Sequence, residues 1–535
     1  MAAEIELKLA ISPHDIPKLA RIPLLKSASR RDVTTSHVFS IYYDTPDFEL
    51  RDQRVALRLR RVGARWMQTL KTAGRVEAGL HEREEIETPV PAQILNYPVL
   101  AESGAAEVLA DPKLPYRLRP VFVTDFRRTT RHLQPVAGTE IEVCLDRGTI
   151  SAGGSQLPLS ELELELKSGA PDQLLELALG LLERVPLRLE AASKAQRGYA
   201  LAAGLTAGPV KATLPGLRPD MPVSEAFRTI VFACIAHLQA NERGLLETED
   251  PEYLHQARVA LRRLRAALSV FGGAFPRVLF EEVIAGLRQL GGSLGPARDW
   301  DVFSIETLPA LSAYFPGEAG LHRLTEHTAE LRAAADDAAR QAIASPRHTE
   351  LLLKLTGIFL REPWLQLDDS ASAAQRALPL PEFSASVLQR RHRKALKHGR
   401  HLAEVDAAGL HALRIQVKKL RYPAEFFSTL YNGDGLRDYL KALADLQQLL
   451  GELNDAATVE RLMEPLRGRD GSEQWLEAAG LVRGWAAGGA PVRREQLTHA
   501  WQRFRDCRHS GTDGSHPLAA CGCAGRRPGS RAETD

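Results

Sequence analysis

The hydrophobic pattern changes its period once along the 535 residues, and this change constrains the fold more than any other feature. Up to about residue 204, short segments such as "IEVCLDRG" and "ELELELK" alternate apolar and polar side chains, as half-buried strands do. Beyond about residue 223, apolar residues recur at spacings of three and four, which is typical of amphipathic helices. The pattern therefore predicts an α+β protein with more than one domain.

The domain boundaries follow from composition. Residues 1–204 form the expected strand-rich domain, with a helical stretch at 171–185, and residues 223–508 form the expected helical domain. Residues 205–222 are rich in Pro and Gly without a clear period, so we expect a linker there. Residues 509–535 are polar and Gly-rich, and we expect a disordered tail.

Composition excludes several classes of protein. The 69 Lys and Arg nearly balance the 67 Asp and Glu, so any anion-binding site must come from local clustering. No stretch of about 18 uncharged apolar residues is present, so no membrane span is expected. The start "MAAEIELKLA" lacks a signal-peptide core, and the five cysteines form no paired CxxC site. We expect a cytoplasmic protein.

Two predicted strands carry carboxylates on one face. In "EIELKLA", Glu4, Glu6 and Lys8 alternate with apolar residues, and in "ELELELK" Glu161, Glu163 and Glu165 do the same. Like charges that face each other across a sheet repel, so a cation would relieve such an arrangement. Mg²⁺ and Mn²⁺ are hard cations that prefer carboxylate oxygens.

Basic residues also keep strand alternation. Arg58 and Arg60 lie in "ALRLRR", Lys71 in "TLKTAG", and Arg83 beside Glu85 in "HEREEIE". Further acidic positions, Glu140, Glu142 and Asp146, lie in "TEIEVCLDRG". A strand surface lined by both signs predicts a polar tunnel in which basic groups hold a polyanion and carboxylates hold a metal ion. The alternative is a set of solvated strand faces with surface salt bridges.

The pattern leaves open which of two adjacent arginines faces the tunnel. Arg127 and Arg128 are adjacent, so on a regular strand only one of them can face the tunnel. Cys144 is assigned to an apolar-parity strand position beside Glu142 and is interpreted as a core residue, and no Ser or Cys nucleophile is predicted.

The N-terminal segments resemble the CYTH domains, or triphosphate tunnel enzymes, from Glu4-x-Glu6-x-Lys8 through "YYDTPDFELR", "TLKTAGRVEAGLHEREE" and "ELELELK" to "ASKAQRGYAL". The "KTAGRVEAGLHER" stretch looks most like the bacterial members that hydrolyse inorganic triphosphate. The resemblance implies an eight-stranded antiparallel tunnel and hydrolysis dependent on Mg²⁺ or Mn²⁺. It implies catalytic roles for Glu4, Glu6, Lys8, Arg58, Arg60 and Lys71, substrate binding by Arg83, Glu85, Arg128 and Lys194, and metal binding by Glu4, Glu6, Glu142, Asp146, Glu163 and Glu165.

The helical half contains an internal repeat. "HQARVALRRLR" begins at His255 and "HALRIQVKKLR" at His411, while "LGPARDWDV" begins at 294 and "LGELNDAATV" at 450. The offset is 411 − 255 = 156 in the first case and 450 − 294 = 156 in the second. The repeat predicts a duplicated helical bundle with pseudo-two-fold symmetry.

Each copy of the repeat places basic residues on one helix face. These residues are His255, Arg258, Arg262, Arg265, His411, Arg414, Lys418 and Arg421. The segments resemble the CHAD domain, which implies paired four-helix bundles and a basic groove that binds polyphosphate. A solvated helix face is the alternative interpretation, and nucleic acid is a less expected partner because no familiar motif is present.

Three functions are compatible with the sequence. The first is a metal-dependent inorganic triphosphatase with a polyphosphate-binding helical domain, associated with cytoplasmic polyphosphate granules. The second is a non-catalytic polyphosphate-binding protein. The third is a CYTH enzyme that acts on another triphosphate, such as thiamine triphosphate or a nucleotide.

Overall fold

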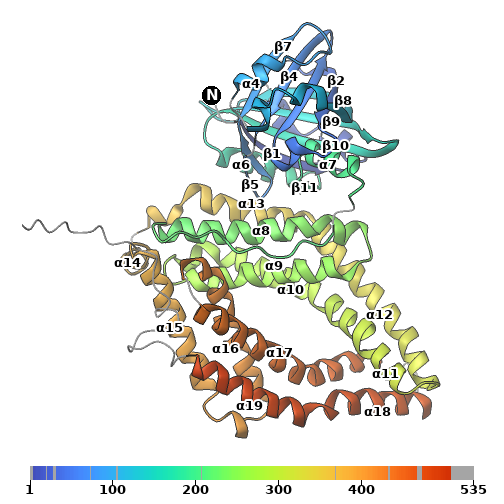
Figure 1. Cartoon of the computed structure of the whole chain (residues 1–535), viewed down its shortest axis with the longest axis vertical. Helices are drawn as coiled ribbons and strands as arrows, with labels where there is room; N and C mark the ends of the chain where they lie inside the picture. The colour runs from blue at the N-terminus through green and yellow to red at the C-terminus, as the bar shows by residue number, and fades with distance from the viewer. Residues whose placement is uncertain are drawn as a thin grey trace, which may run out of the picture. The chain divides into compact units, whose positions relative to one another are not determined.

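The computed structural model describes residues 4–19, 21–27, 32–72, 74–103, 107–205, 208–367, 369–431, 434–466 and 473–507. The chain divides into two compact units (Figure 1). The first comprises residues 1–209 and 344–362, and the second comprises residues 210–343 and 363–535. The chain therefore passes from one unit to the other three times.

An antiparallel sheet forms the centre of the first unit. Its strands are β1 (Glu4–Ile11), β2 (Thr34–Asp44), β3 (Ala56–Val62), β4 (Arg65–Lys71), β5 (Arg75–Glu77), β6 (Leu80–Arg83), β7 (Glu85–Val90), β8 (Arg119–Leu133), β9 (Glu140–Ala152), β10 (Ser155–Ser168) and β11 (Leu187–Leu189). Their order is β5-β6-β1-β10-β9-β8-β2-β3-β4-β7, and β11 pairs with β1.

The sheet is strongly curled. Lys71 in β4 lies 3.0 Å from Glu4 in β1, although β4 and β1 are far apart in the order of strands. The predicted curled antiparallel sheet is confirmed. The described residues form eleven strands rather than eight, because the short strands β5, β6 and β11 extend the pairing around β1.

Along β1, alternation places charged side chains on the inner face and leucines on the outer face. Leu7 and Leu9 of β1 are fully buried on the outer face, in one cluster with Leu174 and Leu175. A second cluster on the outer face contains Leu57 and the residues around it. The helices of this unit are α1 (Ile16–Leu19), α2 (Pro23–Ser27), α3 (Glu49–Asp52), α4 (Tyr97–Glu102), η1 (Glu107–Ala110), α5 (Leu114–Arg117), α6 (Asp172–Leu182), α7 (Lys194–Ala202) and α13 (Pro346–Arg361).

Helix α7 begins at a residue that enters the charged face. The Ser193 side chain accepts from the Gln196 backbone N–H and the Gln196 side chain accepts from the Ser193 N–H, which forms a capping box. Gly198 lies against Phe122 of β8, where a Cβ atom would lie only 2.1 Å from the ring. This close approach fixes α7 against the sheet and sets the position of its first residue, Lys194.

Helix α13 lies in the helical half of the sequence but packs in the first unit. It contacts α6 and β11, and its Leu353 belongs to the same apolar cluster as Leu175 and Leu187. Residues 346–361, which the sequence places in the helical domain, thus complete the core of the strand-rich unit.

The second unit is helical. Its helices and short turns are α8 (Val223–Glu247), α9 (Pro251–Phe271), η2 (Arg277–Phe280), α10 (Glu281–Val302), η3 (Phe303–Thr307), α11 (Leu308–Tyr314), α12 (Ala319–Ala344), η4 (Pro363–Leu365), α14 (Ser370–Arg376), α15 (Leu380–His398), η5 (Leu402–Glu404), α16 (Ala407–Phe426), η6 (Ser428–Leu430), α17 (Asp434–Met463), η7 (Glu464–Leu466), α18 (Glu473–Gly488) and α19 (Ala490–Asp506). No helix in the described part of the chain is long and apolar enough to span a membrane.

The repeat in the sequence is visible in the helices. Helix α9 starts at Pro251 and α16 at Ala407, and 407 − 251 = 156. An aromatic core joins the two copies: Phe271 of α9 stacks on Phe227 of α8 with ring centroids 4.6 Å apart and on Phe383 of α15 at 5.2 Å. The two copies therefore share one core in this unit.

The described part of the expected linker is bound to the helical unit. The Asn241 side chain accepts from the Val210 N–H at 3.0 Å and donates to the Val210 carbonyl at 2.9 Å. Farther along, the Thr429 hydroxyl donates to the Leu217 carbonyl at 3.1 Å. Residues 210–217 thus form an extended segment on this unit, and the expected tail 509–535 lies outside the described residues.

Candidate functional site

The register of three neighbouring strands builds a row of carboxylates. Glu6 of β1 lies directly opposite Glu165 of β10, which lies opposite Glu142 of β9. Residues directly opposite in an antiparallel pair point to the same face, so all three face inward. Their donor set, carboxylate oxygens only, fits a hard divalent cation.

Two residues further along β1, the next inward side chain is a lysine that lies between two carboxylates. Lys8 lies opposite Glu163, and its ammonium group is 2.6 Å from Glu163 and 2.7 Å from Glu6. The side chains of Lys8 and Glu6 are each only 5% exposed. Buried charges require such partners, so each sign holds the other inside the sheet.

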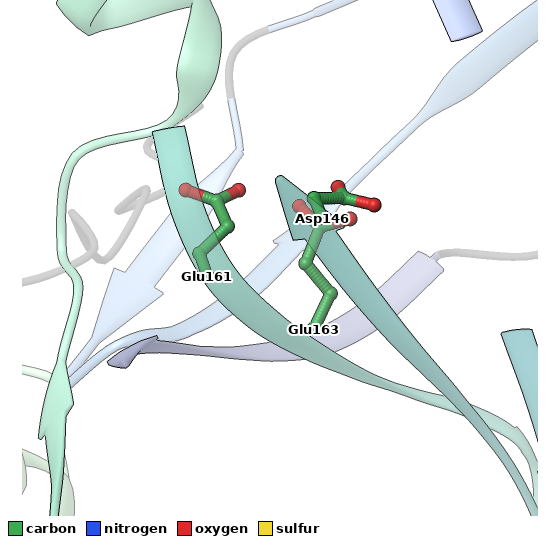
Figure 2. Close-up of side chains that lie close together, drawn as sticks. All are labelled: Asp146, Glu161 and Glu163. Atoms are coloured by element: carbon green, nitrogen blue, oxygen red, sulfur yellow. The ribbon is translucent and has the colours of Figure 1, made fainter. Parts of the chain in front are cut away.

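Asp146, Glu161 and Glu163 form a buried acidic cluster on β9 and β10 (Figure 2). Their ligand oxygens lie within 4.8 Å of one another, the spacing of a metal site. The Lys194 ammonium contacts all three, at 2.7 Å from Asp146 and 3.0 Å from Glu163, with Glu161 as the third partner. In this structure the lysine therefore lies where the three carboxylates meet.

Arg128 faces the inner side and Arg127 the outer side. Arg128 donates to both oxygens of Asp146, at 2.8 and 2.7 Å, and also pairs with Glu163. Arg127 lies opposite Arg147, two positions of the outer face, and its side chain is exposed. The adjacent arginines that the sequence left open are thus separated by strand alternation.

The opposite wall of the sheet carries the remaining basic residues. Arg58 donates to Tyr42 at 3.3 Å and to Glu85 at 3.1 Å. Lys71 lies between Glu4, at 3.0 Å, and Glu85, at 2.8 Å. Arg60 contacts only the Ser40 hydroxyl, at 3.3 Å, and has no carboxylate partner among the described residues.

The pKa values report how charge is distributed. Burial, against the attraction of Lys71 and with the negative charges of Glu6 and Glu85, raises the pKa of Glu4 to about 7. Burial also raises the pKa of Glu85, but Lys71 and Arg58 outweigh it and hold the value at about 2. A proton on Glu4 therefore offsets part of the acidic charge.

The pKa values of two carboxylates on β10, Glu165 and Glu163, shift in opposite directions. Burial raises the pKa of Glu165, with help from Glu142 and Glu6 and against Lys167. In contrast, the pKa of Glu163 is held well below its usual range, because Lys194, Lys8 and Arg128 outweigh its burial. Glu165 therefore has less compensating positive charge around it than Glu163.

Arg60 is a cation on the same inner face as the carboxylate row. Burial and repulsion from Arg58 and Arg128 lower its pKa to about 10. A buried guanidinium among other cations, without a carboxylate partner, favours binding of an anion.

Some residues differ from the sequence interpretation. Glu161, which we did not assign to the site, binds Lys194 and Arg197, although its alternation with Glu163 was visible in the sequence. Cys144 shares the inner face with Glu142 and Asp146 instead of the apolar side, because all three have the same parity in β9. Its thiol lies 3.4 Å from Glu142, and burial raises its pKa to about 12, which agrees with the absence of a predicted thiolate nucleophile. The side chain of Arg83 lies outside the described residues.

The helical unit has a separate basic surface on α9. Arg258 donates to the Leu294 carbonyl at 2.8 Å and lies 3.9 Å from Asp299. Burial lowers the pKa of Arg258 against the attraction of Asp299, and repulsion from Arg262, Arg298 and Arg461 lowers it further. The α9 surface is defined here as His255, Arg258, Arg262, Arg265 and Arg298.

The predicted residues on α16 are more strongly paired. The His411 ring lies 3.0 Å from Asn454, and Arg421 lies 2.6 Å from Glu425. The same Glu425 accepts from Arg263 of α9 at 2.9 Å, which links the two helices. Arg414 and Lys418 have further interactions, so the clearest surplus of positive charge lies on α9, at Arg262 and Arg265.

Comparisons with known proteins match two different families to the N-terminal and C-terminal parts of the chain. Residues 2–199 match the family model of the CYTH domain, and residues 229–464 match that of the CHAD domain. An inorganic triphosphatase of Haemophilus influenzae is 38% identical over 213 residues, which are 38% of this chain and 55% of that protein. The match thus spans about half the length of that relative.

Two further similarities extend into the helical half. An uncharacterized protein of Mycobacterium tuberculosis is 26% identical over 506 residues, which cover 88% of this chain and 90% of that protein. The crystal structure of the CHAD domain from the plant Ricinus communis is 36% identical with a TM-score of 0.49, and the match covers 56% of this chain and 96% of that one.

Proposed function

Because the chain carries a CYTH domain followed by a CHAD domain, we propose that its first unit hydrolyses inorganic triphosphate with a divalent metal ion. The similarity to the inorganic triphosphatase of Haemophilus influenzae supports this substrate. The observation that carries the proposal is the inward row of Glu6, Glu165 and Glu142 beside cations of the same face.

Glu4, Glu6, Glu142 and Glu165 would hold Mg²⁺ or Mn²⁺. Burial raises the pKa values of Glu4 and Glu165, and the neighbouring carboxylates raise them further. A divalent charge would relieve this repulsion. The ion, when bound, supplies Lewis-acid polarisation of the phosphoryl group. Asp146, Glu161 and Glu163 instead fix the cations of the deeper cluster, since Lys194 lies among them.

The basic residues would bind the three phosphates. Arg60 has no carboxylate to release, so we assign it the first contact with the anion. Lys8, Arg58, Lys71, Arg128 and Lys194 are held by carboxylates at 2.6–3.1 Å and can exchange these partners for phosphate oxygens. Arg83 is assigned to substrate on the family resemblance alone.

The reaction needs no covalent enzyme intermediate. A water oriented by an inward carboxylate attacks the terminal phosphorus in line, the bond to the bridging oxygen breaks, and phosphate and pyrophosphate leave. Arginine and lysine side chains neutralise the charge that develops on the leaving oxygen.

The test is phosphate release from four substrates by the full chain, with Mg²⁺ and with Mn²⁺: triphosphate, ATP, thiamine triphosphate and long-chain polyphosphate. Preference for triphosphate supports the proposal. Preference for ATP or thiamine triphosphate would assign a different CYTH activity, and binding of polyphosphate without any hydrolysis would make the protein a non-catalytic binder.

For the second unit we propose polyphosphate binding on the α9 surface, with the α16 residues contributing. The support is the crowding of cationic side chains around Arg258, whose charge Arg262, Arg298 and Arg461 all repel. Asp299 pairs with Arg258 and Arg461, and Glu306 pairs with Arg298. We further propose a cytoplasmic location at polyphosphate granules, which imaging of a fluorescent fusion in cells with and without polyphosphate would test.

A further inference from the structure

Helix α13 has the sequence position of the CHAD match but the contacts of the CYTH unit. Leu353 is 1% exposed and lies in one cluster with Leu175 of α6 and Leu187 of β11. At its C-terminal end, Arg361 donates to Asp172 at 2.9 Å and to Glu176 at 2.8 Å. Apolar burial and two ion pairs thus fasten the helix to α6 and β11.

Strand β11 connects this helix to the candidate site. Leu187–Leu189 pairs with Leu9–Ile11 of β1, directly after Lys8. The Glu190 N–H donates to the Lys8 carbonyl at 2.9 Å, and the Glu190 carboxylate lies 4.0 Å from Arg197 of α7. Glu190, the residue after β11, therefore contacts both the backbone of Lys8 and the side chain of Arg197, which pairs with Glu161.

We propose that α13 positions the hydrolytic site by holding β11 against β1, so that residues within the CHAD match control the triphosphatase. This inference rests on the proposed function. Lys8 is held between Glu6 and Glu163, so a small shift of β1 moves its ammonium away from both carboxylates. A misplacement of about 1 Å can cost on the order of 100-fold in rate.

Positioning and mere stabilisation give different kinetics. A variant that only lowers the folded fraction reduces kcat and leaves KM unchanged. A displaced Lys8 weakens the contact with substrate phosphate, so KM rises as well. Amide hydrogen exchange at Glu190 measures the β11–β1 pairing directly and does not depend on any activity.

The experiment uses the full chain with three substitutions in α13. Leu353→Ala removes packing on β11, Leu353→Met conserves volume, and Arg347→Ala is a matched control because Arg347 is exposed in the first turn of the same helix. Arg361→Ala serves as a second variant if Leu353→Ala does not fold. Polyphosphate binding is measured in parallel as a readout of the helical unit.

We expect Leu353→Ala to raise KM for triphosphate, to lower kcat/KM about tenfold or more, and to accelerate exchange at Glu190, while polyphosphate binding stays unchanged. Leu353→Met and Arg347→Ala should behave as wild type. Unchanged exchange and unchanged KM in Leu353→Ala and Arg361→Ala overturn the inference. If wild type does not hydrolyse triphosphate, the proposed function fails, and exchange at Glu190 alone decides the role of α13.

Discussion

The ammonium group of Lys71 lies 3.0 Å from the carboxylate of Glu4, across two strands that are not neighbours in the sheet. The same ammonium lies 2.8 Å from Glu85, so one cation serves two carboxylates. Burial, with the charges of Glu6 and Glu85, holds the pKa of Glu4 at about 7 despite this partner. Burial also raises the pKa of Glu85, but Lys71 and Arg58 together hold it at about 2. A protonated Glu4 at neutral pH has a measurable consequence.

Metal affinity should increase as the pH rises through about 7. Glu4 keeps its proton below this value, and a divalent ion binds the ionised carboxylate, so metal binding below pH 7 must release a proton. Titration calorimetry with Mg²⁺ or Mn²⁺ in buffers of different ionisation enthalpy measures this proton. Glu4→Gln should abolish the proton release, and an affinity that is constant between pH 6 and 8 in wild type contradicts the assignment.

Glu6→Gln should reduce triphosphate turnover by at least about 100-fold, equivalent to roughly 2.7 kcal/mol of transition-state stabilisation. The amide keeps the shape of Glu6 but removes its charge from the carboxylate row. Glu82→Gln is the matched control, because Glu82 lies on β6 opposite Ile5 and is exposed. EDTA should abolish the activity of wild type, and full activity in EDTA or in Glu6→Gln would exclude a metal site at Glu6.

The adjacent arginines give an internal comparison. Arg128→Ala should lower kcat/KM for triphosphate about 10- to 100-fold, because a charge-assisted hydrogen bond contributes about 1.5–3 kcal/mol. Arg127→Ala removes the same charge one residue away on the outer face and should leave kcat/KM unchanged. Equal losses in both variants would indicate a general electrostatic effect instead of a contact with substrate.

Much of the first unit could be predicted from alternation, because strand parity fixes which residues share a face. Glu4, Glu6 and Lys8 do share a face, and their opposite strand does carry Glu163 and Glu165. Glu161 was left out of the site and Cys144, although buried as expected, was assigned to the wrong face. The same parity placed both residues, so the signal was present and not used. Arg127 and Arg128 were different: the sequence shows that they diverge, but only the pairing of β8 with β9 shows which one meets Asp146.

The role of α13 could not be predicted from local sequence. Its leucines identify an amphipathic helix, and such a face can pack on any apolar surface of suitable shape. The partner, the cluster of Leu175 and Leu187, lies more than 150 residues earlier in the chain and has no pairing signal comparable to a strand register. The alternation of apolar and polar residues shows which face of a strand is buried. No comparable sequence pattern shows which surface a helix packs against.

The α9 surface should bind long-chain polyphosphate with a strong dependence on salt, because a polyanion releases counterions when arginines neutralise it. Arg262→Ala combined with Arg265→Ala should weaken binding by about tenfold or more, since charged contacts contribute about 1.5–3 kcal/mol before solvent screening. Arg243→Ala is a control, because Arg243 already pairs with Glu247 at 2.9 Å. Affinity that is equal in all three proteins, or indifferent to salt, would identify a solvated helix face.

Polyphosphate binding should also tighten as the pH falls below about 6.5. Burial and the charge of Arg298 hold the pKa of His255 below its usual value, so His255 is neutral at pH 7 and becomes charged only in acid. A bound polyanion favours the charged ring, and His255→Gln should reduce the effect. Titrations at pH 5.5 and 7.5 at constant ionic strength measure it, and equal affinities at both values contradict a role for His255.

The late position of α13 in the sequence has a consequence for synthesis on the ribosome. The strands and helices α6 and α7 of the first unit are complete near residue 204, yet Leu353 and Arg361 emerge about 150 residues later. At 5–20 residues per second, the apolar surface of α6 and β11 waits roughly 8–30 s for its cover. During this interval the leucines of α6 and β11, including Leu175 and Leu187, lack their packing partner, so this apolar surface is exposed to other molecules. The order of translation, and any chaperone that covers these leucines, therefore influences how the protein reaches its native state.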